Sequence, residues 1–327
     1  MHPAFSVLFL TTLIGAGQGL FMALFWVETY ALAGLVPEQD PRFFALGSAL
    51  SLILLGLGLF ASFFHLGRPE RAWRTATRWR TSWLSREVIV LPAFMGAVFL
   101  YGLAHWVGFN PVLGTLPGEH PVLLTSVIGA AGVVLALALF VSTAMIYAAV
   151  KFLQEWHSPL TVVNYTLLGM ASGFTLATAH AAWAGNGLVP MLAGWAIILT
   201  LLGLASRVAS LIRNARIKPK STLQTAIGIK HPRIQQKSQG FMGGSFNTRE
   251  FFHHKSEGFV RAVKWTFLVT AFLIPTVLLA VGMSLPVEAT NVLAAAFVIQ
   301  FLGLLAERWF FFAQANHPQN LYYQSVA

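Results

Sequence analysis

Cysteine is absent from the 327 residues, and charged side chains are scarce. Without cysteine the chain forms no disulfide and offers no thiolate to an iron–sulfur cluster or a zinc ion. Asp, Glu, Lys and Arg make up only 10% of the residues, against 56% that are hydrophobic. This composition excludes an ordinary soluble domain and is typical of a polytopic membrane protein. We therefore expect a chain that lies in a lipid bilayer and has no redox group of its own.

Long apolar runs recur along the chain, each close to the roughly 20 residues that cross the hydrocarbon layer as a helix. Eight such runs predict an all-α, polytopic integral membrane protein with one membrane domain. The predicted spans lie near residues 5–33, 44–65, 84–106, 121–150, 161–184, 188–208, 263–283 and 289–312. The fifth and sixth runs are separated by hardly any loop, so the count would change if they formed one broken helix.

The basic residues are distributed unevenly over the two faces that eight spans create. Arg42 is the only one of the 21 Lys and Arg residues assigned to the face away from the termini. The positive-inside rule then predicts that both termini and the basic loops are cytoplasmic, in the inner membrane of a bacterium. An odd number of spans would destroy this asymmetry, so the charge pattern also favours eight.

One extended polar segment, 213–258, interrupts the apolar pattern with basic, glycine and aromatic residues. Loops of this length are usually functional or disordered, so we expect it to be a cytoplasmic surface on which a partner docks. The alternative is a basic loop that lies against anionic lipid headgroups. The two interpretations are compatible.

Two short motifs flank the loop between the second and third spans, with His65 at the end of one span and Glu87 at the start of the next. A quinone needs hydrogen-bonding groups at its two ring oxygens and a partner for the protons that accompany its electrons, and His65 and Glu87 suit that chemistry. Arg68, Trp83 and Arg86 complete the predicted quinone-binding set. The alternatives are an interfacial histidine for His65, and for Glu87 a partner of a loop arginine or a favourable acid in a first helical turn. We predict no residue catalytic for the substrate and no metal ligand.

Three further ionisable residues, Glu28, His105 and His180, lie toward the opposite face and could form a proton path. Snorkelling near a membrane interface is the simpler interpretation. Two histidines also raise the possibility of bis-imidazole haem ligation, but both lie near helix ends and no second pair exists. The alternative from another functional class is a proton channel or transporter. Such proteins typically contain an internal repeat, and the sequence shows no convincing repeat.

Other polar and small residues receive structural interpretations. Glu307 and Arg308 stand beside aromatic residues near the end of the last span, which predicts snorkelling toward the interface. Gly15, Gly17 and Gly19 in the first span predict close packing against another helix.

The run HLGRPERAW at 65–73, followed by TSWLSRE at 81–87, resembles the anchor subunits of dimethyl sulfoxide reductases. The C-terminal AERWFFFA at 306–313 is also similar, so the resemblance covers essentially the whole chain. It implies a subunit without haem that exchanges electrons between ubiquinone or menaquinone and a four-cluster ferredoxin-like iron–sulfur subunit. That iron–sulfur protein would in turn contact a molybdopterin catalytic subunit. The family ties its histidine and glutamate to quinol binding, which carries over to His65 and Glu87.

The segment 213–258 is longer than expected of a bacterial dimethyl sulfoxide reductase anchor, and its part 243–253 is more similar to the anchors of cytoplasmic sulfite-oxidising complexes. We therefore expect sulfite oxidation coupled to quinone reduction. The alternatives are an anchor that supplies quinol electrons to a dimethyl sulfoxide or related S/N-oxide reductase, and a purely structural anchor whose quinone is bound elsewhere. The residues predicted to dock the iron–sulfur partner are Arg71, Arg74, Arg78, Arg80 and Arg249.

Overall fold

The computed structural model describes residues 5–116, 120–218, 220–235, 237, 255–285 and 289–318. In this part of the protein eight helices are long and apolar enough to cross a membrane. The predicted all-α fold with eight spans is therefore confirmed. Arg249 and the segment 243–253, which bear on the partner and on the substrate, lie outside the described residues.

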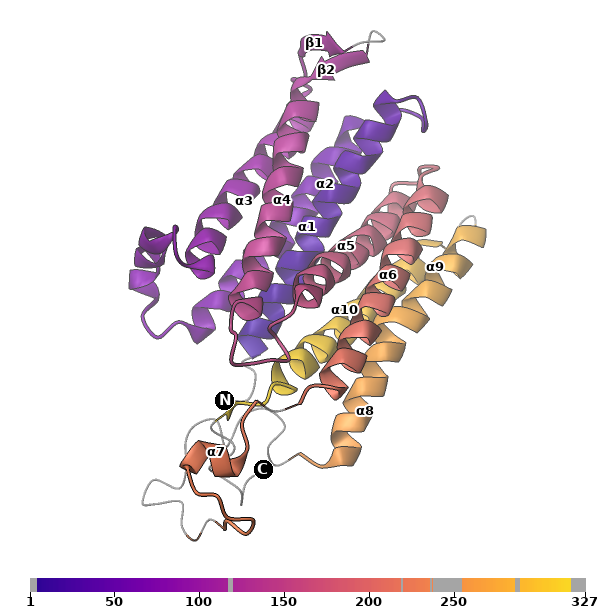
Figure 1. Ribbon diagram of the computed structural model, residues 1–327. Coiled ribbons are helices and arrows are strands. Elements are labelled where there is room, and N and C mark those ends of the chain that lie inside the picture. The colour runs from indigo at the N-terminus through magenta and orange to yellow at the C-terminus, as the bar shows by residue number, and fades with distance from the viewer. Residues whose placement is uncertain are drawn as a thin grey trace.

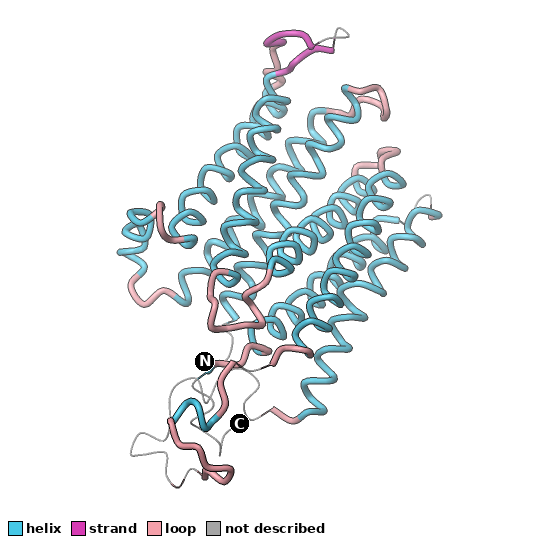
Figure 2. The backbone as a smooth tube through the Cα atoms, in the orientation of Figure 1, coloured by secondary structure: helices cyan, strands magenta, loops and turns pink. Residues whose placement is uncertain are grey.

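The spans follow one another in sequence order, with short elements between them (Figures 1 and 2). They are α1 (Phe5–Leu32), α2 (Pro41–Ser62) with the turn η1 (Phe63–His65), α3 (Trp83–Val107), α4 (Leu124–Ala148), α5 (Pro159–Trp183), α6 (Val189–Ala215), the continuous unit α8 (Glu257–Leu268), η4 (Val269–Leu273) and α9 (Ile274–Ser284), and α10 (Ala289–Ala313). The short elements are η2 (Pro69–Arg78), the strands β1 (Val112–Leu116) and β2 (His120–Leu123), and α7 (Leu223–Ile227).

Capping side chains fix where several helices begin. The side chains of Asp40, Ser82, Ser158 and Ser256 each accept a hydrogen bond from a backbone N–H in the first turn of α2, α3, α5 and α8. Such caps satisfy N–H groups that have no partner within the helix. Gly108 ends α3 with a φ of 68°, in the left-handed region that glycine adopts without strain.

The spans form two groups of four. In the first group α1, α2, α3 and α4 contact one another in a ring, and in the second α5, α6, α9 and α10 do the same. Figure 1 shows the first group in indigo to magenta and the second in rose to yellow, with α1 and α5 side by side where the groups meet. The central seam of the molecule is therefore built from the first helix of each group.

The two ends of the bundle differ in character. We call the end where α1, α3, α5 and α8 begin the basic end, because η2 and its arginines lie there, and the other end the hairpin end, because β1 and β2 lie there. The start of α1 and the end of α10 both lie at the basic end (Figure 1). Residues near these helix ends therefore share one side of the bilayer.

Several helix boundaries differ from those predicted, among them the start of the seventh span, which lies at Glu257 instead of near residue 263. The fourth span begins at Leu124, because residues 120–123 pair with β1 in an antiparallel hairpin and the side chain of Asn110 accepts a hydrogen bond from the N–H of Thr125. The sixth span continues to Ala215 instead of ending near residue 208. Arg207, which lay at the end of the predicted span, therefore lies eight residues before the end of α6.

A π-helical turn, η4, interrupts the seventh span just before Pro275. Proline has no N–H to donate to the carbonyl one helical turn earlier, so the oxygen of Ala271 loses its usual partner. The amide of Gln300 in α10 replaces it at 3.3 Å and also contacts Thr200 Oγ1 at 3.1 Å. The irregular turn is therefore stabilised by a side chain from the neighbouring helix.

The contact between α1 and α5 depends on glycine. Gly15 lies against Gly169, and Gly19 lies against Gly173, with backbone facing backbone. Gly17 faces α2 instead, where its carbonyl accepts a hydrogen bond from Ser51 at 2.8 Å. Small residues let membrane helices approach this closely, so the predicted packing role of these glycines is confirmed.

Candidate functional site

A pocket lies at the junction of the two helix groups, toward the basic end. Its cavity volume is about 20 Å³, and the open space around that cavity, with the mouth and solvent included, is about 430 Å³. The lining residues come from α1, α3, α4, α5 and α10: Thr11, Thr12, Ile14, Gly15, Gln18, Glu87, Phe140, Thr143, Tyr165, Leu168, Gly169, Ser172, Leu304 and Arg308. A mostly apolar hollow with a few convergent polar groups is the usual form of a small-molecule site.

Glu87 is the one acid among the lining residues in the described part of the protein. The cap at Ser82 starts α3 so that Glu87 follows in its first two turns, and only 8% of Glu87 is exposed. Thr143 of α4 donates a hydrogen bond to its carboxyl oxygen at 2.6 Å. A buried carboxyl at membrane depth is costly and marks a functional site by default. This one faces the pocket, and no described residue forms an ion pair with it within 4 Å.

The other residues of the predicted quinone set do not line this pocket. His65 and Arg68 are exposed on η1 and just after it. Arg86 points back to the loop, where it donates to the carbonyls of Trp79 and Arg80, both at 3.0 Å, and its guanidinium lies 4.0 Å from the ring centre of Trp83. The structure therefore separates Glu87 from the other four residues of the set, whose quinone role stays a prediction.

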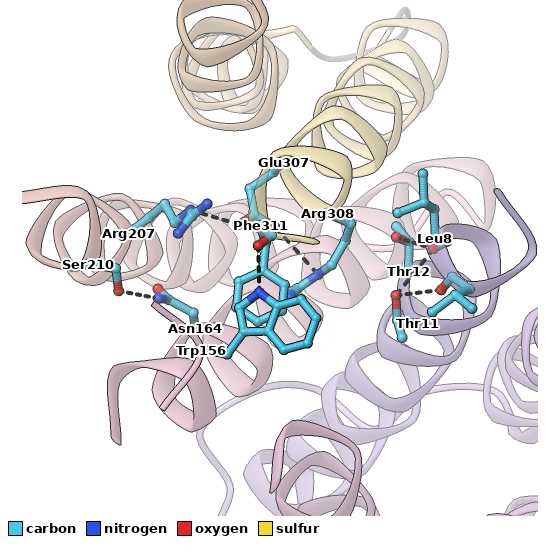
Figure 3. Close-up of polar contacts among 11 residues, drawn as sticks. Leu8, Thr11, Thr12, Trp156, Asn164, Arg207, Ser210, Glu307, Arg308 and Phe311 are labelled. Atoms are coloured by element: carbon cyan, nitrogen blue, oxygen red, sulfur yellow. Dashed lines mark hydrogen bonds and ion pairs between the residues drawn. The ribbon is translucent and has the colours of Figure 1, made fainter. Parts of the chain in front are cut away.

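A buried ion-pair cluster lies beside the pocket, where Glu307 stands between two arginines (Figure 3). Its Oε1 is 2.7 Å from Nε of Arg207 in α6, and its Oε2 is 3.4 Å from Nε of Arg308 in α10. Arg207 and Glu307 are each 1% exposed and Arg308 is 5% exposed. The prediction that Glu307 and Arg308 snorkel to the interface is therefore wrong, because both side chains point into the bundle.

Aromatic side chains surround these charges. The guanidinium carbon of Arg308 lies 3.7 Å from the ring centre of Tyr165, and Tyr165 in turn stacks on Tyr147 at 5.8 Å. Arg207 lies 5.5 Å from the ring centre of Phe267. Such contacts attract a desolvated guanidinium to the ring face. They hold Arg308 at the pocket wall, which makes it a functional candidate that the sequence pattern alone assigned to the interface.

The arginines predicted to dock a partner are exposed at the basic end. Arg71, Arg74 and Arg78 belong to η2, and Arg80 follows it. The hydroxyl of Ser85 in α3 donates to the carbonyl of Thr75 at 2.5 Å, which ties η2 to the start of α3. Exposed tryptophans alternate with these arginines, since Trp73 is 65% and Trp79 is 53% exposed. The segment therefore presents a basic and aromatic face.

At the hairpin end, Glu28 lies in a second polar cluster. Its carboxylate accepts hydrogen bonds from Tyr101 at 2.9 Å and from Thr125, and Nε2 of His105 lies 4.0 Å away. His105 also stacks on Phe44 at 4.6 Å. The structure brings two of the three predicted proton-path residues together, each held by several neighbours.

His180 is separate from that cluster. Its Nε2 lies 3.0 Å from the carbonyl of Phe43, and its ring stacks on Phe43 at 4.7 Å. Between Glu28 and the pocket with Glu87, the core of the first helix group contains buried aromatic rings, with Phe21 packed edge-on against Phe94 at 5.5 Å. The proton path stays a prediction.

Comparison with known proteins agrees with this architecture. The sequence matches the family described as DMSO reductase anchor subunit (DmsC) over residues 1–314. It is 58% identical to a sulfite dehydrogenase subunit of Allochromatium vinosum over 327 residues, which cover the full length of both proteins. It is also 30% identical to one polypeptide of the anaerobic dimethyl sulfoxide reductase of Haemophilus influenzae over 131 residues, 39% of this protein and 42% of that one. The protein therefore belongs to the family of DMSO reductase anchor subunits, as an integral membrane member with eight apolar helices.

Proposed function

We propose that this protein anchors a molybdopterin and iron–sulfur oxidoreductase in the bacterial cytoplasmic membrane and lets its partner exchange electrons with quinone. The observation that carries this proposal is the pocket between the helix groups, with Glu87 on one wall and Arg308 on another. Quinone chemistry needs an apolar site for the ring, hydrogen-bonding groups for its oxygens and a group that moves protons. The residues of this pocket fit those needs.

The substrate proposal rests on relatedness. Full-length identity of 58% to a sulfite dehydrogenase subunit favours sulfite oxidation over reduction of a sulfoxide. Oxidation of sulfite to sulfate, with water as the source of the added oxygen, releases two electrons and two protons, and reduction of a quinone to quinol takes up two of each. The catalytic partner would perform the first reaction, and iron–sulfur clusters in a second partner would deliver the electrons to quinone in this membrane subunit.

The proposed orientation places the basic end in the cytoplasm. Arg42 of α2 lies at the hairpin end, whereas the arginines from residue 68 to residue 86 lie at the basic end. Positive charge favours the cytoplasmic side. The pocket lies toward the same end, so the partner that donates electrons would dock near it, on η2 and the adjoining basic loop.

We expect membranes that contain the complete complex to reduce decylubiquinone or menadione when sulfite is added. The rate should be measured beside reduction of a soluble dye by the same membranes, because a dye takes electrons from the partners directly. Sulfite oxidation with dye but with neither quinone would contradict the proposed quinone role. If sulfite does not support reduction of the dye, but quinol supports reduction of dimethyl sulfoxide, the protein would instead be the anchor of a dimethyl sulfoxide reductase.

The lack of cysteine makes labelling a direct test of orientation and docking. We expect Arg74→Cys, at the basic end, to react with a membrane-impermeant maleimide only when the cytoplasmic face is accessible. Gly187→Cys, in the exposed turn between α5 and α6, should react only from the other face. Labelling of Arg74→Cys should also fall when the iron–sulfur partner is co-expressed, while labelling of Gly187→Cys stays unchanged. Reaction of both sites from one face would contradict the topology.

A further inference from the structure

We propose that Arg308 binds the quinone directly: its guanidinium donates a hydrogen bond to the ring oxygen that lies away from Glu87. This inference rests on the proposed function, because it takes the pocket to be the quinone site. It adds a specific residue and a polarity to that site, with an acid at one end of the ring and a fixed cation at the other.

The charge balance of the buried cluster is the first argument. Arg207, Glu307 and Arg308 together leave one positive charge in excess, and all three side chains are nearly inaccessible. An excess charge away from water is expensive unless something compensates it. Arg207 already pairs with Glu307 at 2.7 Å. Neutralising Glu307 therefore does not explain why a second arginine, Arg308, is buried beside it.

The position of the second arginine is the second argument. Arg308, and not Arg207, lines the pocket. Glu307 approaches Arg308 at Nε, and the guanidinium lies over Tyr165, another residue of the pocket wall. A guanidinium has five N–H donors in a fixed fork, so the group that Glu307 holds in place still has donors for a ligand.

The other polar groups of the wall are the third argument, since several of them are engaged within the protein. Gln18 donates to the carbonyl of Ala136 at 2.8 Å, Thr12 donates to that of Leu8 at 2.8 Å, and Thr143 donates to Glu87. Among the lining residues that the structure describes, only Arg308 carries a fixed positive charge. It is therefore suited to the oxygen on which negative charge develops as electrons arrive.

The chemistry assigned to Arg308 is electrostatic. In this scheme the guanidinium only donates a hydrogen bond, so the two protons of quinol formation come from elsewhere, one of them through Glu87. The hydrogen bond from a charged donor favours both binding and electron acceptance. Glu307 is a positioning residue in this scheme because it acts through Arg308.

The test is Arg308→Gln in the complete complex, assayed with sulfite and decylubiquinone. We expect the KM for decylubiquinone to rise about 10- to 100-fold, the usual effect of losing a hydrogen bond to a charged group, while dye-linked sulfite oxidation stays unchanged. Two controls separate this effect from general damage. Gln300→Leu alters a buried polar residue of the same helix that does not line the pocket, and Arg42→Gln removes an exposed charge at the hairpin end. Both should leave the KM unchanged.

A KM in Arg308→Gln no higher than in Gln300→Leu would overturn the proposal. If the complex with Arg308→Gln does not assemble, Arg308→Lys is the deciding variant, because it keeps the charge but loses the forked N–H donors of the guanidinium. A raised KM for decylubiquinone in this variant would support the contact between Arg308 and the quinone. An unchanged KM would overturn it. Glu87→Gln, assayed in parallel, separates the proposed role of Arg308 from the proposal that the pocket is the quinone site. Loss of quinone reduction in Glu87→Gln with a normal KM in Arg308→Gln would reject Arg308 alone, whereas normal kinetics in both would reject the pocket.

Discussion

Glu87→Gln is expected to slow sulfite-dependent quinone reduction by about 100-fold or more, the range that a positioned acid–base group contributes. The change keeps the shape of the side chain and its contact with Thr143, but an amide cannot pass a proton. Glu87 is the only acid among the described residues of the pocket wall, so none of these residues offers a second carboxyl to replace it. The measurement is steady-state reduction of decylubiquinone by membranes with the complete complex.

Dye-linked sulfite oxidation is the internal control of that experiment, and it should stay at the wild-type level because the partners perform it. Glu155→Gln is a matched variant: it makes the same chemical change at the basic end, in the turn between α4 and α5, without lining the pocket. It should retain quinone reduction. Wild-type quinone kinetics in Glu87→Gln would show that protons reach the quinone by another route and would reject the proton-transfer role of Glu87.

The number of spans was predictable from the sequence because it depends on local composition. An apolar run of about 20 residues has one stable solution in a bilayer, which is a helix that satisfies its own backbone. Boundaries were less predictable where a competing local structure exists. The hairpin at 120–123 shortens α4, and α6 extends past residue 208 because Arg207 finds a partner inside the bundle.

The candidate site was predictable only in part. Glu87 stood out because an acid at a span edge is rare, and the structure places it in a pocket. Arg308 did not stand out, since a charged residue beside tryptophan near a helix end is also the pattern of snorkelling. The distinction depends on which way α10 faces, and that is set by packing against α5 and the seventh span, which are distant or separate elements of the fold.

A signal for the buried cluster was nevertheless present. Glu307 and Arg308 precede the end of α10 by several residues, and Arg207 lies eight residues before the end of α6. Opposite charges at similar depth in two spans indicate an interhelical pair, because each would be costly alone. Which arginine pairs most closely and which faces a cavity could be learned only from the three-dimensional packing.

Gly173→Val is expected to prevent accumulation of the protein in the membrane, the largest effect on stability that the fold predicts. A Cβ at this position would overlap the backbone of Gly19 and Leu20, where α5 crosses α1. Backbone atoms of two packed helices cannot rotate away as flexible side chains do, so α1 and α5 would have to separate. Overpacking in a core typically lowers the free energy of unfolding by about 1–3 kcal/mol. The overlap of a branched side chain with backbone atoms should lower it by more than this.

Gly173→Ala should give the graded version of this effect, with a lower temperature of unfolding in detergent and weaker retention of quinone activity. Gly56→Ala is the matched control, because a Cβ on this α2 glycine would meet nothing within 4 Å and alanine favours a helix over glycine by about 1 kcal/mol. It should be as stable as the wild type or more so.

The pocket residues Gly15 and Gly169 lie one turn from the Gly19 and Gly173 contact, so widening this crossing also changes the pocket wall. Normal stability of Gly173→Val would mean that α1 and α5 are farther apart in the membrane than in this structure, and the pocket at their junction would then have to be redrawn.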